Sequence, residues 1–265
     1  MKTLGLALGS GGARGAAHLG LLQALEEENI RPDFITGCSM GAVVGGGYAA
    51  GVTVGDLLAT VRELKASDLL DLDGLTTFTK LGIFKGNKIR KILMSKIGDV
   101  TFDKLKIPFS CVAVDILSGK LVELNSGEVA EAVRASSAIP TVFRPVELNG
   151  MMLVDGGTLC RVPVRQCKNM GADVVVAFDV LANTGESVDK VPNVFLKILR
   201  VYDIMDYHRT EIAKRDNKDC YDLWLAPALE GLSQYEVKDA EKAYELGYEY
   251  AKQHVGEILS LLKDF

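Results

Sequence analysis

Apolar residues along this chain alternate between short continuous runs and segments with helical spacing. The runs predict strands at residues 3–8, 34–36, 108–117, 120–124, 142–148, 151–154, 173–178 and 221–225. The other segments predict helices at residues 16–28, 41–50, 87–97, 129–135, 193–213 and 239–262, and a further helix opens at a capping box formed by Thr53 and Asp56. Because strands alternate with helices, the pattern predicts an α/β layered fold with a mainly parallel centre.

Two dipeptides between expected strands mark hairpins, Ser118-Gly119 and Asn149-Gly150. The run at 173–178 is almost continuously apolar, as in a sheet covered on both faces. No internal repeat, low-complexity tract or linker is evident. We therefore expect one domain over residues 1–265, with the C-terminal helices of residues 193–262 as part of it.

The composition supports a large core. The chain has 265 residues, of which 48% are hydrophobic and 25% charged, and its formal net charge is −5. These values argue against disorder, and the absence of a long basic run argues against nucleic acid as a partner. None of the 5 cysteines forms a C-x-x-C pair and only 3 histidines are present, so we expect free thiols in a reducing cytosol and no structural zinc.

One uncharged stretch is long enough to cross a bilayer as a helix, at residues 34–55. It contains 7 glycines, each of which costs about 1 kcal/mol in a helix interior relative to alanine. A buried strand, turn and helix explain it better. The apolar run at the N-terminus is too short for a signal peptide, so the expected location is cytoplasmic.

The clearest chemical motif is Gly37-Cys38-Ser39-Met40-Gly41, between an expected strand and an expected helix. This is the setting of a G-x-S-x-G nucleophile elbow, in which a sharp turn exposes the serine hydroxyl at a helix N-terminus. Glycines are needed because a Cβ on either side of the turn would clash. The motif predicts that Ser39 is a nucleophile, against the alternative of a packing turn.

A glycine-rich loop at residues 9–15 also follows a strand and precedes a helix. It lacks the Lys-Ser or Lys-Thr of a P-loop, and it lacks both the register and the acidic residue of a dinucleotide fingerprint. The remaining interpretation is an oxyanion hole, with backbone donors near Gly11 and Gly12 facing a carbonyl oxygen under attack by Ser39. Two adjacent parallel strands bring both turns to the same sheet edge.

Two further segments say little alone, Asp155-Gly156-Gly157 and the run from Ala135 to Pro140. Together with the other two motifs, however, they occur in the order found in one family. The chain resembles the patatin-like phospholipases, specifically their compact bacterial members. The resemblance spans about residues 4–179 and is specific because four spaced motifs coincide. It implies a three-layer α/β/α fold with a mainly parallel central sheet.

The resemblance also implies a mechanism. Ser39 is the nucleophile and Asp155 the base of a Ser-Asp dyad, Gly11 and Gly12 form the oxyanion hole, and Arg14 orders that loop. The motif glycines that support these groups are Gly9, Gly15, Gly37, Gly41, Gly156 and Gly157. The implied substrate is a lipid carboxylic ester, as for a phospholipase A, lysophospholipase or esterase, with no metal and no cofactor.

The chain departs from the family pattern at one place. Family members often have an asparagine shortly after D-G-G and before a proline, whereas this chain has Cys160-Arg161 there. The departure puts the support of the aspartate loop in doubt, but not the dyad itself.

The histidines leave alternatives open. Ser39, Asp155 and His208 follow the chain order of an α/β-hydrolase triad, although His208 lies in an expected exposed helix. His18 is expected to pack behind the glycine loop and His254 to lie at the surface. A non-catalytic nucleotide- or lipid-binding module that keeps the glycine loop is the other alternative.

Residues 66–97 combine a loop-rich stretch that contains apolar residues with a helix carrying Lys88, Arg90, Lys91 and Lys96. We expect this segment to form a lid or an interfacial patch over Ser39, with peripheral membrane contact. An ordinary core layer with a solvated face is the competing interpretation.

Overall fold

The fold is built on one sheet of eight strands, described by a computed structural model that covers residues 1–63, 84–182, 191 and 193–263. Its strand order is β5-β6-β3-β2-β1-β7-β8, and β4 pairs with β3 off this path. The strands are β1 (Leu4–Leu8), β2 (Phe34–Gly37), β3 (Phe109–Asp115), β4 (Lys120–Leu124), β5 (Val146–Leu148), β6 (Met151–Asp155), β7 (Val174–Phe178) and β8 (Leu223–Leu225).

The centre of the sheet is parallel, as the sequence predicts. β3, β2, β1, β7 and β8 pair in parallel, whereas β4 and β6 are antiparallel to β3, and β5 to β6. Both expected hairpins form. Asn149 and Gly150 have φ angles of 51° and 77°, the pair of positive values that a tight hairpin turn requires.

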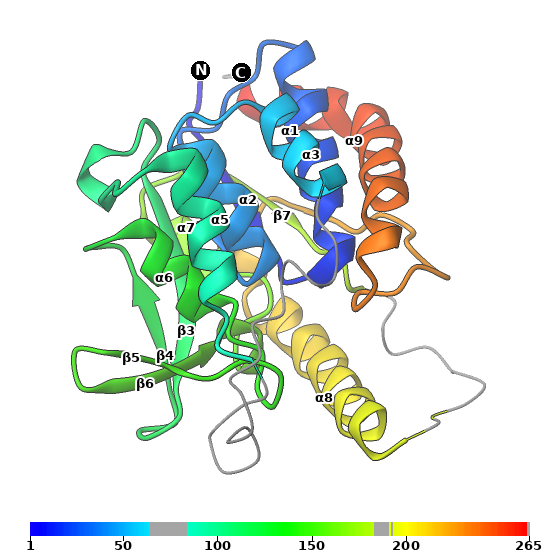
Figure 1. Ribbon diagram of the computed structural model, residues 1–265. Coiled ribbons are helices and arrows are strands. Elements are labelled where there is room, and N and C mark those ends of the chain that lie inside the picture. The colour runs from blue at the N-terminus through cyan, green and yellow to red at the C-terminus, as the bar shows by residue number, and fades with distance from the viewer. Residues whose placement is uncertain (64–83, 183–190, 192, 264–265) are drawn as a thin grey trace.

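Helices cover both faces of the sheet, which gives three layers (Figure 1). They are α1 (Ala17–Glu27), α2 (Met40–Ala49), α3 (Val54–Glu63), α5 (Asn87–Ile97), α6 (Val129–Ser136), α7 (Val164–Asn169), α8 (Val194–Asp216) and α9 (Ala240–Leu262). The capping box is confirmed, since Asp56 N donates to Thr53 Oγ1 at 3.1 Å. The short α7 is not predicted by the sequence pattern, and β5 begins at Val146, later than the expected strand.

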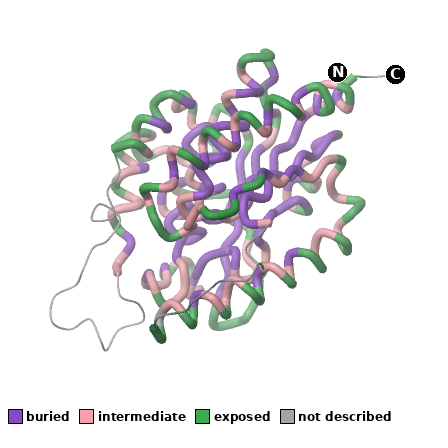
Figure 2. The backbone as a smooth tube through the Cα atoms, turned by 90° about the vertical axis from the view of Figure 1, so that its right-hand side faces the viewer, coloured by how far each residue is buried: buried purple, intermediate pink, exposed green. Residues whose placement is uncertain are grey.

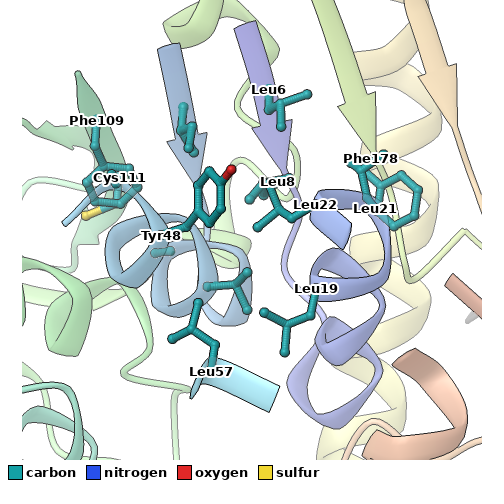
Figure 3. Close-up of a cluster of buried hydrophobic side chains, with 14 of the residues drawn as sticks. Leu6, Leu8, Leu19, Leu21, Leu22, Tyr48, Leu57, Phe109, Cys111 and Phe178 are labelled. Atoms are coloured by element: carbon teal, nitrogen blue, oxygen red, sulfur yellow. The ribbon is translucent and has the colours of Figure 1, made fainter. Parts of the chain in front are cut away.

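The two faces of β1 explain the pattern of large and small residues in its sequence. Leu6 and Leu8 lie in the larger core, beside residues of α1 and α2 (Figure 3), and Leu4 belongs to the same core. Ala7 belongs to the smaller core, which includes residues of α7. A Cβ at Gly5 would lie 2.5 Å from Cys167 Sγ, so α7 packs closely on this face. Buried residues follow the strands and the inner sides of the helices (Figure 2).

The uncharged stretch at 34–55 forms β2, a turn and α2, as predicted. Within the described parts of the chain, none of the helices has both the length and the hydropathy needed to span a bilayer.

Candidate active site

Ser39 stands between β2 and α2 in a backbone conformation that side chains rarely adopt, with φ 53° and ψ −119°. Such a conformation costs roughly 1–3 kcal/mol and is typical of functional turns. A Cβ at Gly37 would lie 2.5 Å from Ala42 Cα, and one at Gly41 would lie 2.2 Å from Leu8 O. The expected sharp turn from strand to helix is confirmed, and glycine is required on both sides of it.

The glycine-rich loop at 9–15 lies at the same sheet edge, because β1 and β2 are parallel neighbours. Ala13 N donates to Gln234 O at 2.9 Å, which holds one end of the loop. Among the described residues, no hydrogen bond uses the N–H of Gly11 or Gly12. Two backbone donors in this loop therefore remain available to a ligand.

A C-terminal segment closes over this loop. Arg14 is buried and its Nε donates to Leu232 O at 2.9 Å. Gly12 has φ 50°, and a Cβ there would lie 2.1 Å from Gln234 O. Arg14 thus orders the loop by joining it to residues far along the chain. The sequence motifs, which end before residue 180, gave no signal for Leu232 or Gln234.

Asp155 ends β6 and is only 2% exposed. Its Oδ1 accepts a hydrogen bond from Gly157 N at 2.7 Å and lies 3.8 Å from Cys38 Sγ. Burial raises the pKa of this carboxyl to about 6, although the nearby Ser39 hydroxyl and the hydrogen bond from Gly157 N lower it. Asp155 is a stronger base than an exposed carboxylate.

The contact between Ser39 and Asp155 is loose. The serine hydroxyl is close enough to lower the carboxyl pKa, yet within the described chain Asp155 Oδ2 has no partner in standard hydrogen-bond geometry. Nucleophile–base contacts are often long before substrate binds. The structure therefore brings the two expected residues together without a formed hydrogen bond.

The segment from Ala135 to Pro140 touches both residues. Ser39 N donates to Ser136 Oγ at 3.0 Å, and Asp155 N donates to Ala138 O at 2.9 Å. The sequence singled out this segment but gave it no role. Its position shows that it holds the backbones of the two residues relative to each other.

Ser39 also lies on the wall of a cavity of about 280 Å³. Most of its lining is apolar, including Leu19, Val43, Leu57, Ile92, Ile139 and Phe143. Within the described parts of the chain, Lys96 is the only charged residue in the lining. A cavity of this kind suits a hydrocarbon chain next to a reacting serine.

Part of the expected lid can be located. Residues 64–83 lie outside the described residues. Helix α5 is present with its expected bounds, and it supplies Ile89, Leu93 and Lys96 to the wall of the cavity.

The Cys160-Arg161 departure from the family pattern has a structural explanation. The Arg161 guanidinium is fully buried and donates to Asp179 at 2.8 Å and to Asp206 of α8 at 2.9 Å. Arg209, also on α8, donates to Asp206 and to Gly157 O, the latter at 2.5 Å. Through Arg209, this charge cluster supports the aspartate loop.

Replacing Arg161 with methionine is expected to lower the free energy of unfolding by about 3–5 kcal/mol, because it removes the cation bound to buried Asp179 and leaves buried Asp206 with Arg209 alone. Urea denaturation measures this. Arg165→Met is the matched control, since Arg165 is exposed and its loss should cost less than about 0.5 kcal/mol. Equal losses in the two variants would show that the cluster does not stabilise the fold.

The histidines lie apart from the carboxylate. His18 is buried, its Nε2 donates to Gly9 O at 2.8 Å, and burial lowers its pKa to about 4. His208 is exposed on α8, and His254 lies 2.7 Å from Tyr250 O through Nδ1. Among the described residues, no hydrogen bond or ion pair joins a histidine to Asp155. The same residues contain no group of three or more histidines, cysteines and acids that could hold a metal ion.

Comparisons with known proteins agree with this geometry. Residues 6–168 match the family model described as Patatin-like phospholipase. An uncharacterised NTE family protein of Mycobacterium bovis is 40% identical over 190 residues, which cover 71% of this chain and 52% of the relative. A lysophospholipase of Emericella nidulans is 27% identical over 98% of this chain and 18% of its own length. The chain thus spans about half the length, or less, of these curated relatives.

Solved structures share the fold. VipD from Legionella pneumophila superposes with a TM-score of 0.62 at 15% identity, covering 97% of this chain and 67% of that one. Human GIVD cytosolic phospholipase A2 superposes with a TM-score of 0.55 at 10% identity, and the match covers 98% of this chain and 60% of that one. Both matches extend through α8 and α9, beyond the sequence motifs.

Proposed function

Because the chain belongs to the patatin-like phospholipase family, we propose that it hydrolyses carboxylic ester bonds of lipids through an acyl-Ser39 intermediate. One observation carries the proposal: Ser39, in its strained turn, lies beside buried Asp155 and on the wall of an apolar cavity. The relatives named as phospholipases or lysophospholipases support this substrate class.

In the first half of the reaction, Asp155 accepts the Ser39 proton as Oγ attacks the ester carbonyl carbon. The tetrahedral intermediate collapses, the C–O bond to the alcohol breaks, and Asp155 returns the proton to the leaving alcohol. In the second half, Asp155 takes a proton from water, which attacks the acyl-enzyme. The fatty acid leaves as the proton returns to Ser39 Oγ.

Aspartate is a weaker base than histidine, and the raised pKa of Asp155 recovers part of the difference. The rest of the catalysis depends on the oxyanion. We assign its stabilisation to the N–H groups of Gly11 and Gly12, with Arg14 holding their loop. One such donor contributes roughly 3–4 kcal/mol in serine hydrolases.

The pH profile should report Asp155. The base must be ionised, so kcat/KM for a soluble short-chain aryl ester should be constant well above the carboxyl pKa of about 6. Below that pKa it should fall by about tenfold per pH unit as Asp155 becomes protonated. A profile that stays flat from about pH 8 to about pH 5, in enzyme shown to survive the lower pH, would exclude Asp155 as the base.

Two histidine variants separate the dyad from a Ser-Asp-His triad. His208→Ala should leave kcat within about threefold of wild type, because an exposed α8 residue takes no part in proton transfer. His18→Ala should weaken activity modestly, since it frees the Gly9 carbonyl behind the oxyanion loop. A loss of several orders of magnitude in folded His208→Ala would instead make Asp155 the orienting acid of a triad.

The test of the proposed function is fatty-acid release from a defined lipid. Purified enzyme is incubated with lysophosphatidylcholine or with diacyl phosphatidylcholine, and free fatty acid is quantified by mass spectrometry. The proposal predicts release by the wild type and none by Asp155→Asn. Failure to release fatty acid from either lipid, in protein that hydrolyses a short aryl ester, would contradict the lipid assignment.

A further inference from the structure

Helix α8 buries polar side chains at Asp206 and Thr210 and leaves several apolar side chains exposed, unlike an ordinary surface helix. Six apolar side chains on it are exposed: Ile204 (38%), and five that recur at helical spacing, Val194 (71%), Ile198 (48%), Val201 (51%), Met205 (64%) and Ile212 (52%). Their spacing of three, four and seven residues places them along one side of the helix, and together they form what we name the α8 stripe.

The polar side of α8 faces inward and is explained by the active site. Asp206 and Thr210 are 4% and 3% exposed, and Asp206 binds Arg161. Arg209 holds the Gly157 carbonyl of the aspartate loop. The active site does not explain the apolar residues of the stripe, and none of them belongs to the larger or the smaller core.

Helix α8 is hydrogen-bonded to residues that line the cavity. Asp203, on the same helix, accepts hydrogen bonds from Gln234 Nε2 at 2.9 Å and from Tyr235 Oη at 2.8 Å. Gln234 and Tyr235 both line the cavity that contains Ser39, and Tyr235 is 41% exposed. The cavity lining and α8 are therefore joined directly.

We propose that the α8 stripe docks on the surface of a lipid bilayer and holds the enzyme there through the helix that is bonded to the cavity lining. This inference rests on the proposed function, since a lipid substrate is taken from such a surface. The five side chains extend over roughly 27 Å, and a single amphipathic helix of this kind can lie in the plane of the headgroups. The N-terminal end of α8 also projects away from the body of the molecule, which leaves it accessible to a flat surface (Figure 1).

A second copy of the chain is a poorer occupant. The stripe is one side of a single helix, whereas a stable protein interface buries about 800 Å² on each partner. A bilayer needs no matching protein surface. The polar side chains of α8 carry both signs of charge, so we expect apolar insertion to dominate and the binding to persist at high salt.

The test measures co-sedimentation with phosphatidylcholine vesicles in the presence of high salt. A Ser39→Ala background prevents hydrolysis of the vesicles. Adding Val201→Asp and Met205→Asp should lower the partition coefficient by at least about tenfold. The matched control pair is Ile116→Asp with Leu117→Asp, at exposed apolar positions of the β3–β4 turn, and it should stay within about twofold of the background.

Three outcomes decide the matter. If the α8 double variant binds vesicles less than the control double variant does, the proposal is supported. If the two double variants have equal partition coefficients, the proposal is overturned. Sedimentation velocity without lipid supplies the third: a wild-type dimer that the α8 pair converts to monomer would make the stripe a self-interface and overturn bilayer docking.

The failure of this inference is distinguishable from failure of the proposed function. With Ser39 intact, the Val201→Asp, Met205→Asp double variant should hydrolyse a soluble aryl ester at the wild-type rate, because the exposed side chains at these two positions face away from the site. Vesicle binding without any ester hydrolysis would contradict the proposed function but not bilayer docking by the α8 stripe. Hydrolysis of the aryl ester and of micellar lipid without vesicle binding would contradict only bilayer docking by the α8 stripe.

Discussion

Replacing Ser39 with alanine is expected to lower kcat for a short-chain aryl ester by about 10⁴-fold or more. The change removes the atom that forms the acyl-enzyme. The fold should persist, because alanine has the same backbone limits as serine at φ 53° and the buried Ser39 side chain makes no standard hydrogen bond to Asp155 Oδ2.

Ser137 offers a matched control in the same cavity. It is 7% exposed, it lines the cavity, and its Oγ has no hydrogen-bond partner in the described structure. Ser137→Ala should therefore retain activity within about threefold of wild type. Turnover by Ser39→Ala comparable to that of Ser137→Ala would remove Ser39 from the mechanism.

The second large effect is expected from Asp155→Asn, which should lower kcat by about 10³-fold or more because the amide cannot accept the serine proton. In the double variant with Ser39→Ala, the two losses should be far from additive, since nucleophile and base act as one unit. Single-turnover and steady-state rates on the aryl ester measure both.

The stability of Asp155→Asn separates loss of catalysis from loss of folding. The folded-state pKa of Asp155, about 6, lies above its usual value of 3.8. The stability linked to this group is therefore present at low pH and lost as pH rises through about 6, where the buried carboxylate ionises. At neutral pH the asparagine variant should be no less stable than the wild type. An inactive variant that is also unfolded would leave the role of the base without support.

How far the sequence could predict the site depends on which contacts are local. Ser39 and the loop at 9–15 were placed together correctly, because each follows a strand and the two strands are parallel neighbours. Asp155 reaches them only through the antiparallel pairing of β6 with β3, in which Asp155 lies opposite Ala113. No periodicity predicts that pairing, and only the resemblance to a family pointed to Asp155.

The parts that the sequence missed depend on long-range contacts. Arg161 is stabilised by acids 18 and 45 residues away, and the glycine loop is bonded to a segment more than 200 residues later. Composition and spacing cannot show which charges meet across such distances. The interpretation of residues 1–265 as a single domain stays a prediction.

The central claim is that Ser39 is an activated nucleophile with Asp155 as its base. Intact-mass spectrometry after incubation with a fluorophosphonate, followed by peptide mapping, tests it most directly. The account predicts one stable adduct located on Ser39, which forms much more slowly in Asp155→Asn and at the wild-type rate in His208→Ala. An adduct on another residue, or labelling of Ser39 that does not depend on Asp155, would contradict it.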